Sequence, residues 1–353
     1  MKEVILAQAR SLGFDVCRVT RAGLPDHAEE FRTWLKEGCA GEMAWLERNQ
    51  DRRTDPDLVL PGAKSVIVLG MNYWQGESRS TAPGLGPSVA RYAWGDDYHE
   101  LIEAKLKQLD AFLQSQGGVQ KCYVDTGPVL ERDFAGSSGV GWHGKSTMLI
   151  HPNLGTWLFL AEIFTTLELP PDLKYPDRCG HCTRCIDACP TGAIVAPHKL
   201  DARKCISYLT IELKGSIPEA MRPLIGHRIY GCDECLKACP WNRFAQESQV
   251  AEFQARPWLE GTLLRDLLSF DDEQFRTVFR KSPIKRIKRR GFLRNVCVAL
   301  GNIGTEEDLL ALKKASLDPE PLIAEHAAWA IQEITSRKES HSSPPLEANQ
   351  AGP

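Results

Sequence analysis

The chain has 353 residues, of which 42% are hydrophobic and 25% are charged, and its formal net charge is −3. This length can bury the cores of two or three domains, and the small net charge gives no global reason to expect a polyanionic partner. Gln8 and Arg10 interrupt the apolar N-terminal stretch, which therefore fits neither a secretory signal nor a membrane span. We expect a cytoplasmic protein that is not bound to membranes.

The first part of the chain alternates predicted helices and strands. Apolar periodicity predicts helices around residues 4–14, 28–38 and 100–116, and strands over 65–73 and 120–128. This alternation indicates an α/β domain. The domain has no G-x-G-x-x-G after its first strand and no P-loop, so we expect no dinucleotide site of the Rossmann kind.

Three polar stretches interrupt the apolar elements of this domain, over residues 91–99, 124–134 and 139–146. Rigid neighbouring elements can hold such loops around a ligand. Asp125 follows the second predicted strand, where it could simply fix a turn through the backbone. Beside a redox centre, however, its carboxyl could donate a proton if burial raises its pKa. The stretch 91–99 could equally be a polar loop that leads into the next helix.

Twelve cysteines are present, and eight of them fall between residues 179 and 239. Such clustering in a reducing compartment suggests metal rather than disulfides. The stretch CGHCTRCIDACPTGAI matches the C-x2-C-x2-C-x3-C-P run of ferredoxins, in which the fourth thiolate binds a second 4Fe–4S cluster. A second run, YGCDECLKACP, has Ile229 where its first cysteine should stand, and Cys205 can replace that ligand.

Two ligand sets follow from this pattern. The first cluster is predicted to bind Cys179, Cys182, Cys185 and Cys239, and the second to bind Cys189, Cys205, Cys232 and Cys235. Structural zinc is the alternative, although zinc does not require the third cysteine or the repeated Cys-Pro ending. The other cysteines are expected to be small core residues: Cys17, Cys39, Cys122 and Cys297.

The C-terminal third contains two similar segments, RNVCVALGNI and EHAAWAIQEI, which align at an offset of 31 residues. This spacing predicts a HEAT-like helical repeat. Between them, TEED predicts a capping box at a helix start. The polar tail from Ser336 is expected to be disordered. Ahead of the repeat lies the basic stretch 281–294, which is either a solvated face or a phosphate-binding surface.

Several motifs together resemble the epoxyqueuosine reductases, which are cobalamin-dependent iron–sulfur enzymes of the last step of queuosine biosynthesis in tRNA. The matching stretches span nearly the whole chain and are GEMAWL, RYAWGDDYH, VDTGPVLER, the first cysteine run, ARKCISYLTIELKG, GHRIYGCDECLKACPWNR and SPIKRIKRRGFLRNVCVALGNIG.

The resemblance implies an α+β multidomain fold. A nitroreductase-like α/β domain over residues 1–170 would bind cobalamin, and a ferredoxin-like domain over 171–245 would hold two 4Fe–4S clusters. A helical HEAT-like module over 246–335 would bind tRNA, and 336–353 would be a disordered tail.

The resemblance also implies the reaction, which is the reduction of epoxyqueuosine to queuosine at the wobble position of tRNA, with Asp125 as proton donor. The candidate cobalamin contacts are Arg53, Arg91, Tyr98, Lys145 and Ser146. The candidate tRNA contacts are Lys285, Arg286, Lys288, Arg289 and Arg290. The cobalamin motif D-x-H-x-x-G is incomplete, because Ile102 replaces its glycine, so His99 is not expected to bind cobalt.

The expected partners are the anticodon stem-loop of a tRNA that carries epoxyqueuosine and an external electron donor, and the chain is expected to act as a monomer. Two alternatives remain. A reductive dehalogenase-like enzyme would reduce a small molecule and need no RNA. A cobalamin-processing or RNA-binding protein would catalyse no reduction and would leave two clusters without a purpose.

Overall fold

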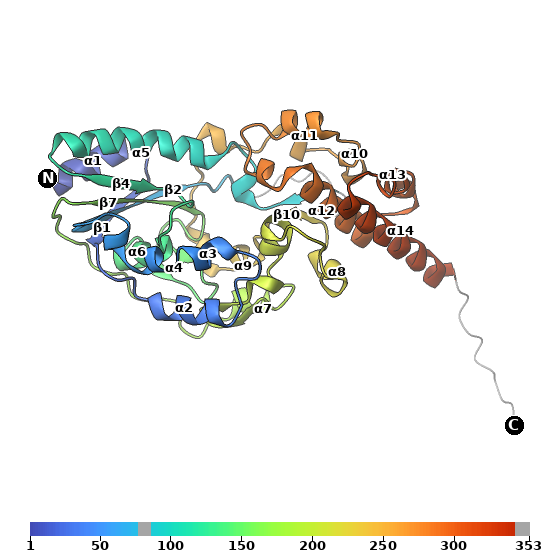
Figure 1. Ribbon diagram of the computed structural model, residues 1–353, viewed down its shortest axis with the longest axis horizontal. Coiled ribbons are helices and arrows are strands. Elements are labelled where there is room, and N and C mark those ends of the chain that lie inside the picture. The colour runs from blue at the N-terminus through green and yellow to red at the C-terminus, as the bar shows by residue number, and fades with distance from the viewer. Residues whose placement is uncertain (77–85, 343–353) are drawn as a thin grey trace, which may run out of the picture.

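The computed structural model describes residues 1–76 and 86–342, with side chains up to residue 339. The N-terminal α/β region and the C-terminal helices lie at opposite ends of an elongated molecule (Figure 1). The helices are α1 Lys2–Ser11, α2 Ala28–Lys36, α3 Ala44–Arg48, α4 Gln50–Thr54, α5 Tyr98–Ser115, α6 Glu131–Ser137, α7 Arg184–Asp187, α8 Arg222–Ile225, α9 Glu234–Lys237, α10 Leu264–Leu267, α11 Asp272–Val278, α12 Lys288–Ile303, α13 Leu309–Ala315 and α14 Pro321–Ser342.

A four-stranded antiparallel sheet forms the centre of the N-terminal region, with the strand order β1-β2-β7-β4. The strands of the described chain are β1 Val16–Arg21, β2 Ser65–Asn72, β3 Ser88–Val89, β4 Gln120–Tyr123, β5 Trp142–His143, β6 Leu149–Ile150, β7 Leu158–Thr165, β8 Ile194–Ala196, β9 Lys199–Leu200 and β10 Arg228–Tyr230. The predicted strands correspond to β2 and β4, whereas β1 and β7 were not predicted.

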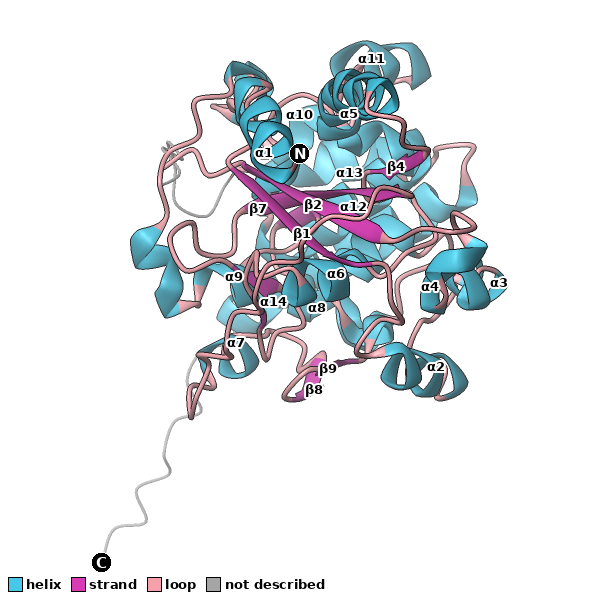
Figure 2. Ribbon diagram, turned by 90° about the vertical axis from the view of Figure 1, so that its left-hand side faces the viewer, coloured by secondary structure: helices cyan, strands magenta, loops and turns pink. Residues whose placement is uncertain are grey.

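Both faces of the sheet are covered, which explains why all eight residues of β2 are buried. On one face, Ile67 and Leu69 pack with apolar residues of α1 and α5. On the other, Val66 and Val68 pack with Phe134 of α6. Figure 2 shows the sheet between these two layers. Alternate residues of a strand point to opposite faces, so a continuous apolar run is the pattern expected of a strand buried on both sides.

The cysteine-rich region is built mostly of loops and short helices. Helices α7 and α9, which follow the first cysteines of the two runs, pack against each other. Strand β10 pairs in parallel with β3 of the N-terminal region. The side chain of the buried Asn295 on α12 donates hydrogen bonds to the carbonyls of Thr210 and Ile229, at 2.8 and 2.9 Å. Contacts therefore cross both domain boundaries predicted from the sequence.

The C-terminal helices α12 and α14 pack closely together. A Cβ added to Gly301 would lie 2.3 Å from the ring of Trp329, so this crossing requires a glycine. Ala299 and Ala330, which align in the predicted repeat, are both fully buried. The predicted capping box is present, with Thr305 as the N-cap and Asp308 as its partner. A HEAT-like repeat nevertheless stays a prediction.

One sequence expectation needs correction at the C-terminus. Helix α14 continues through Ser342, so residues 336–342 are helical and do not belong to a disordered tail. The rest of the predicted tail, 343–353, lies outside the described residues. Among the helices described, none is long and apolar enough to cross a membrane.

Candidate active site

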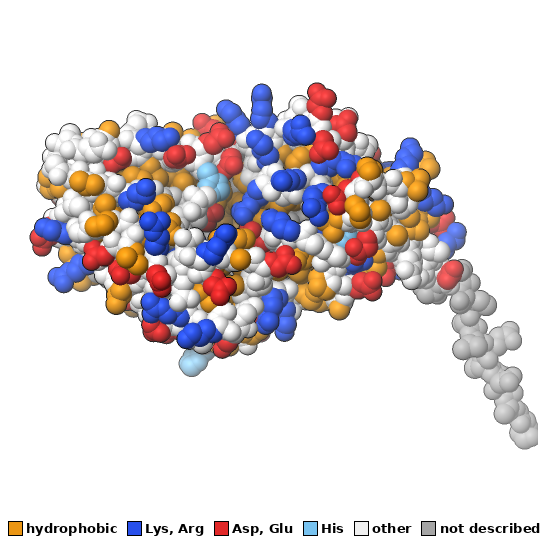
Figure 3. All heavy atoms as spheres, viewed as in Figure 1, with side chains coloured by type: hydrophobic (Ala, Val, Ile, Leu, Met, Phe, Trp, Pro, Cys, Tyr) orange, Lys and Arg blue, Asp and Glu red, His pale blue; other side chains and the backbone are white. Residues whose placement is uncertain are grey.

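A cavity of about 2380 Å³ lies where the three regions of the chain meet. It is larger than the 300–1,000 Å³ or so of a typical small-molecule pocket, so it can hold a large cofactor together with part of a substrate. In Figure 3 the surface is hollowed between the α/β region and the C-terminal helices, and Lys and Arg side chains gather on the side of those helices.

Asp125 stands on the cavity wall just beyond the end of β4. Its backbone is left-handed, with φ of 56°, which few residues other than glycine adopt without strain. Its amide donates a 2.6 Å hydrogen bond to Glu131 Oε1. The hydroxyl of Tyr98 donates to Asp125 Oδ2 at 2.6 Å, and His99 Nε2 lies 3.5 Å from the same oxygen. These contacts fix the carboxylate in a position where it faces the cavity.

The proton in this cluster resides on histidine rather than on Asp125. Burial opposes ionisation of Asp125, but the ion pair with His99 and the hydrogen bond from Tyr98 outweigh it and hold the pKa of Asp125 below its ordinary value. Burial likewise opposes a charged His99, but its contacts with Asp125 and Asp97 raise its pKa to about 9. The sequence-based idea that burial raises the pKa of Asp125 is therefore wrong, because the fold places a cation beside it.

The carboxyl groups of Glu131 and Glu162 lie close to Asp125, and the sequence analysis singled out neither of them as a site residue. Burial raises the pKa of Glu131 to about 8, and the charge of Asp125 adds to the rise. Burial and the neighbouring Glu131 raise the pKa of Glu162, on β7, well above its ordinary value. Glu162 is fully buried inside an apolar strand. Two like charges at one buried site cannot both form at neutral pH, so this pair retains at least one proton.

The eight clustered cysteines form two groups, and none of them is in a disulfide in the part of the chain that the structure describes. Burial raises the pKa of Cys239 to about 11, and repulsion from Cys179, Cys185 and Cys182 adds to the rise. Burial likewise raises the pKa of Cys235 well above its ordinary value, with repulsion from Cys205, Cys232 and Cys189. Charge repulsion weakens with distance, so the thiols of each group lie near one another. The thiols that repel one another are those that the sequence assigns to the same ligand set, and binding of a cluster by each set stays a prediction.

The two groups differ in their position relative to the cavity. The cavity lining includes Cys189, Cys205, Cys232 and Cys235 but none of the other four. The first group lies outside the cavity, where Lys145 Nζ donates hydrogen bonds to the carbonyls of Gly180 and Cys182, at 2.6 and 3.1 Å. A redox centre in the second group would therefore face a ligand in the cavity, and one in the first group would not.

Three of the five predicted cobalamin contacts line the cavity: Arg53, Tyr98 and Ser146. The other two do not. Lys145 is turned toward the first cysteine loop. The guanidinium of Arg91 is buried and stacks on Trp74 and Trp94, with 3.9 and 4.3 Å to the ring centroids. In this structure Lys145 therefore holds the first cysteine loop by hydrogen bonds, and Arg91 packs between aromatic rings, so cobalamin contacts at these two residues stay a prediction.

The predicted basic surface also divides in two. Lys285, Arg286 and Lys288 line the cavity, and Arg286 forms a 2.8 Å ion pair with Glu212. By contrast, Arg289 is half-buried and paired with both carboxylate oxygens of Asp318, while Arg290 reaches Glu320 at 3.6 Å. Arg289 and Arg290 therefore link α12 to the loop before α14, although Arg290 stays exposed, and their contact with tRNA stays a prediction.

Taken together, these features define an iron–sulfur oxidoreductase in which an α/β region and a cysteine-rich region share one large cavity. Residues 178–242 match the family model described as a 4Fe–4S double cluster binding domain. Residues 53–126 match the one described as "Epoxyqueuosine reductase QueG, DUF1730". The epoxyqueuosine reductase of Xanthomonas campestris is 43% identical over 330 residues, covering 92% of this chain and 93% of the relative. The chain belongs to the epoxyqueuosine reductase family, which confirms the resemblance inferred from its motifs.

Solved structures agree with this placement. A crystal structure of epoxyqueuosine reductase with an epoxyqueuosine-modified tRNA-Tyr stem loop has a TM-score of 0.88 and 32% identity, covering 98% of this chain and 95% of that one. Epoxyqueuosine reductase from Bacillus subtilis, with its catalytic aspartate loop swung out of the active site, has a TM-score of 0.84 and 30% identity at the same coverage.

Proposed function

We propose that this chain reduces epoxyqueuosine to queuosine at the wobble position of tRNA. The observation that carries the proposal is the convergence on one cavity of an ion-paired aspartate, a four-cysteine group and a set of lysines. Conversion of an epoxide to an alkene consumes two electrons and two protons and releases water. The chain must therefore bring an electron source, a proton source and an RNA loop to the same place.

The cofactors are cobalamin and two 4Fe–4S clusters. The cavity volume suits a cofactor as large as cobalamin, and the Nε atom of Arg53 is buried without a hydrogen-bond partner among the described residues, which suits a polar group of a bound ligand. Arg53, Ser146 and the apolar wall around Leu158 would hold it. The four-cysteine groups are the donor set that 4Fe–4S clusters prefer. The cobalt and the clusters supply the electron chemistry, and the protein supplies orientation and protons.

In this proposal Asp125 takes a proton from His99 and passes it to the epoxide oxygen. Its carboxylate faces the cavity, and one carboxylate oxygen, Oδ2, contacts both Tyr98 and His99. Because His99 keeps its proton up to a pH of about 9, it can resupply Asp125 after each transfer. Asp97, which accepts from His99 at 2.7 Å, positions the imidazole for this role.

The reaction can be tested directly by nucleoside mass spectrometry. Anaerobic incubation of the reconstituted protein with cobalamin, a strong reductant and tRNA that carries epoxyqueuosine should remove one oxygen atom from the modified nucleoside. Omission of cobalamin should abolish the change. An unchanged nucleoside, with both clusters intact, would favour reduction of a small molecule, which is the remaining alternative for this site.

The tRNA would bind through phosphate contacts at the rim of the cavity. Lys285 and Lys288 are exposed there, and a modified base splayed from the anticodon loop could enter between them. Release of counterions makes such binding depend steeply on salt. As further parts of the proposal, the protein acts in the cytoplasm as a monomer and takes electrons from an external donor.

Replacing Lys285 or Lys288 with alanine should weaken tRNA binding and lower the slope of log K against log salt by about 1 for each lysine. The loss should be similar for modified and unmodified stem-loops, because phosphates carry no sequence information. Fluorescence titration at several salt concentrations measures both quantities. Lys313→Ala, at an exposed lysine on α13 away from the cavity, serves as the control and should change neither. Equal slopes for all four proteins would place the tRNA elsewhere.

A further inference from the structure

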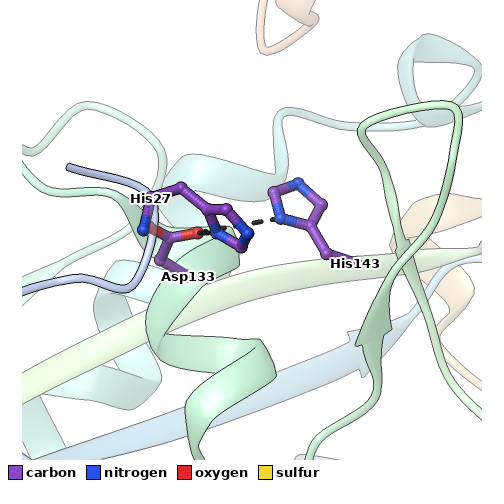
Figure 4. Close-up of side chains that lie close together, drawn as sticks. All are labelled: His27, Asp133 and His143. Carbon is purple, nitrogen blue, oxygen red and sulfur yellow. Dashed lines mark hydrogen bonds and ion pairs between the residues drawn. The ribbon is translucent and has the colours of Figure 1, made fainter. Parts of the chain in front are cut away.

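A second cluster of titratable groups, which shares none of the hydrogen bonds or ion pairs described for Asp125, lies on the cavity wall. It consists of His27 just before α2, Asp133 on α6 and His143 on β5 (Figure 4). One potential ligand atom from each residue lies within 4.8 Å of the other two. Asp133 Oδ1 is 2.7 Å from His27 Nδ1 and 3.7 Å from His143 Nδ1. The reductase reaction proposed above uses none of the three.

The surrounding hydrogen bonds fix how these groups face one another. His143 Nε2 lies 3.0 Å from the carbonyl of Thr147 and must donate to it, so Nδ1 of a neutral His143 carries a lone pair. Asp133 Oδ2 accepts the backbone amide of His27 at 3.0 Å, which turns Oδ1 toward the two imidazoles. Two acceptors, His143 Nδ1 and Asp133 Oδ1, thus point at the same space.

A hydrogen bond between His27 and Asp133 that served only to stabilise the fold would not require a second acceptor, His143 Nδ1, beside the carboxylate. The single proton on His27 Nδ1 satisfies Asp133 but leaves the lone pair of His143 directed at a carboxylate. The side chain of Asp133 is only 4% exposed, so water does little to reduce the repulsion. A cation bound between the three atoms removes it.

We propose that His27, Asp133 and His143 bind one divalent transition metal ion of the zinc type. Two imidazole nitrogens and one carboxylate oxygen suit zinc and its neighbours, whereas calcium and magnesium prefer sites made of oxygen. The carbonyl of Thr147 orients His143 in the way that outer-shell partners orient metal-binding histidines. Binding would release the proton of His27 Nδ1.

The site is open to an ion from the cavity, and its three protein ligands do not complete the coordination of that ion. The side chain of His27 is 48% exposed, so an ion can enter from the cavity. Three protein ligands leave at least one position for water or for an anionic oxygen of a bound ligand. The metal would also join the loop before α2, helix α6 and strand β5 at the wall of the cavity.

Zinc binding to the anaerobically reconstituted protein, with both clusters and cobalamin in place, tests the proposal. Equilibrium dialysis against Zn²⁺ should give one ion per chain. X-ray absorption at the zinc edge should show nitrogen and oxygen ligands at about 2.0–2.2 Å and no sulfur. His143→Gln should weaken binding at least about tenfold, since even loss of an outer-shell partner costs about 10- to 100-fold.

His198→Asn is the matched control. His198 is an exposed histidine on the same cavity, and its φ of 64° is one that asparagine tolerates. This variant should bind zinc as the unmodified chain does. Zinc held by sulfur alone, or equal binding by the chain and His143→Gln, would overturn the proposal. If His143→Gln fails to fold, the absorption spectrum of the unmodified chain still decides. Zinc binding and epoxide reduction are measured separately, so either can fail without the other.

Discussion

Replacing Asp125 with asparagine should lower the rate of epoxide reduction by about 10²- to 10⁴-fold, the usual contribution of a positioned proton donor. Asparagine keeps the shape of the side chain and can still accept from Tyr98, but it cannot carry a proton. The clusters should be unaffected, since none of the hydrogen bonds and ion pairs described for Asp125 involves a cysteine loop. Single-turnover nucleoside mass spectrometry measures the rate.

Asp97→Asn is the companion variant for this experiment. It leaves Asp125 in place but removes the charged partner that His99 contacts at 2.7 Å. The activity of the unmodified chain should fall as the pH rises through about 9, where His99 loses its proton. In Asp97→Asn this alkaline limb should move to lower pH, because a lost anionic partner lowers the pKa of histidine. If Asp125→Asn retains a rate within about threefold of the unmodified chain, the proton comes from elsewhere.

The cysteine groups could be predicted from the sequence because their chemistry is local. Cluster-binding runs require fixed spacings, and the missing ligand of the second run left Cys205 as the one candidate within the interval. The strands β2 and β4 could also be predicted, since continuous or alternating apolar runs are visible in the chain. Strand β7 was not predicted. Its buried Glu162 interrupts the apolar pattern of the strand, which explains the miss in part.

The side chains around the cavity were harder to predict, since their roles depend on contacts between distant segments. Arg91 lies in a polar stretch that reads as a ligand loop, yet Trp74 and Trp94 enclose its guanidinium. Likewise, the ionised state of Asp125 depends on His99, which is far away in sequence but adjacent in space. A charge run in the sequence does not show which of its cations are ion-paired in the fold, as Arg289 is with Asp318 and Arg290 with Glu320.

Each predicted ligand set combines cysteines from both runs. This crossed assignment leads to a second large expected effect. If each run bound its own cluster, Cys182 and Cys189 would share one. The structure instead groups Cys189 with Cys205, Cys232 and Cys235 on the cavity wall. The double variant Cys189→Ser/Cys232→Ser should therefore lose one cluster and keep the other intact, with about four irons per chain. Epoxide reduction should fall to background, because the remaining cluster does not face the cavity.

The reciprocal double variant, Cys182→Ser/Cys189→Ser, separates the two assignments. In the crossed arrangement it removes one ligand from each cluster, so no cluster keeps four cysteines. Electron paramagnetic resonance of the reduced protein should then show the unperturbed signal of an intact cluster in the Cys189/Cys232 variant and not in the Cys182/Cys189 variant. Cys122→Ser, at a thiol outside both groups, should leave both signals unchanged. The opposite pattern would mean that each run binds its own cluster, and the order in which electrons approach the cavity would have to be assigned anew.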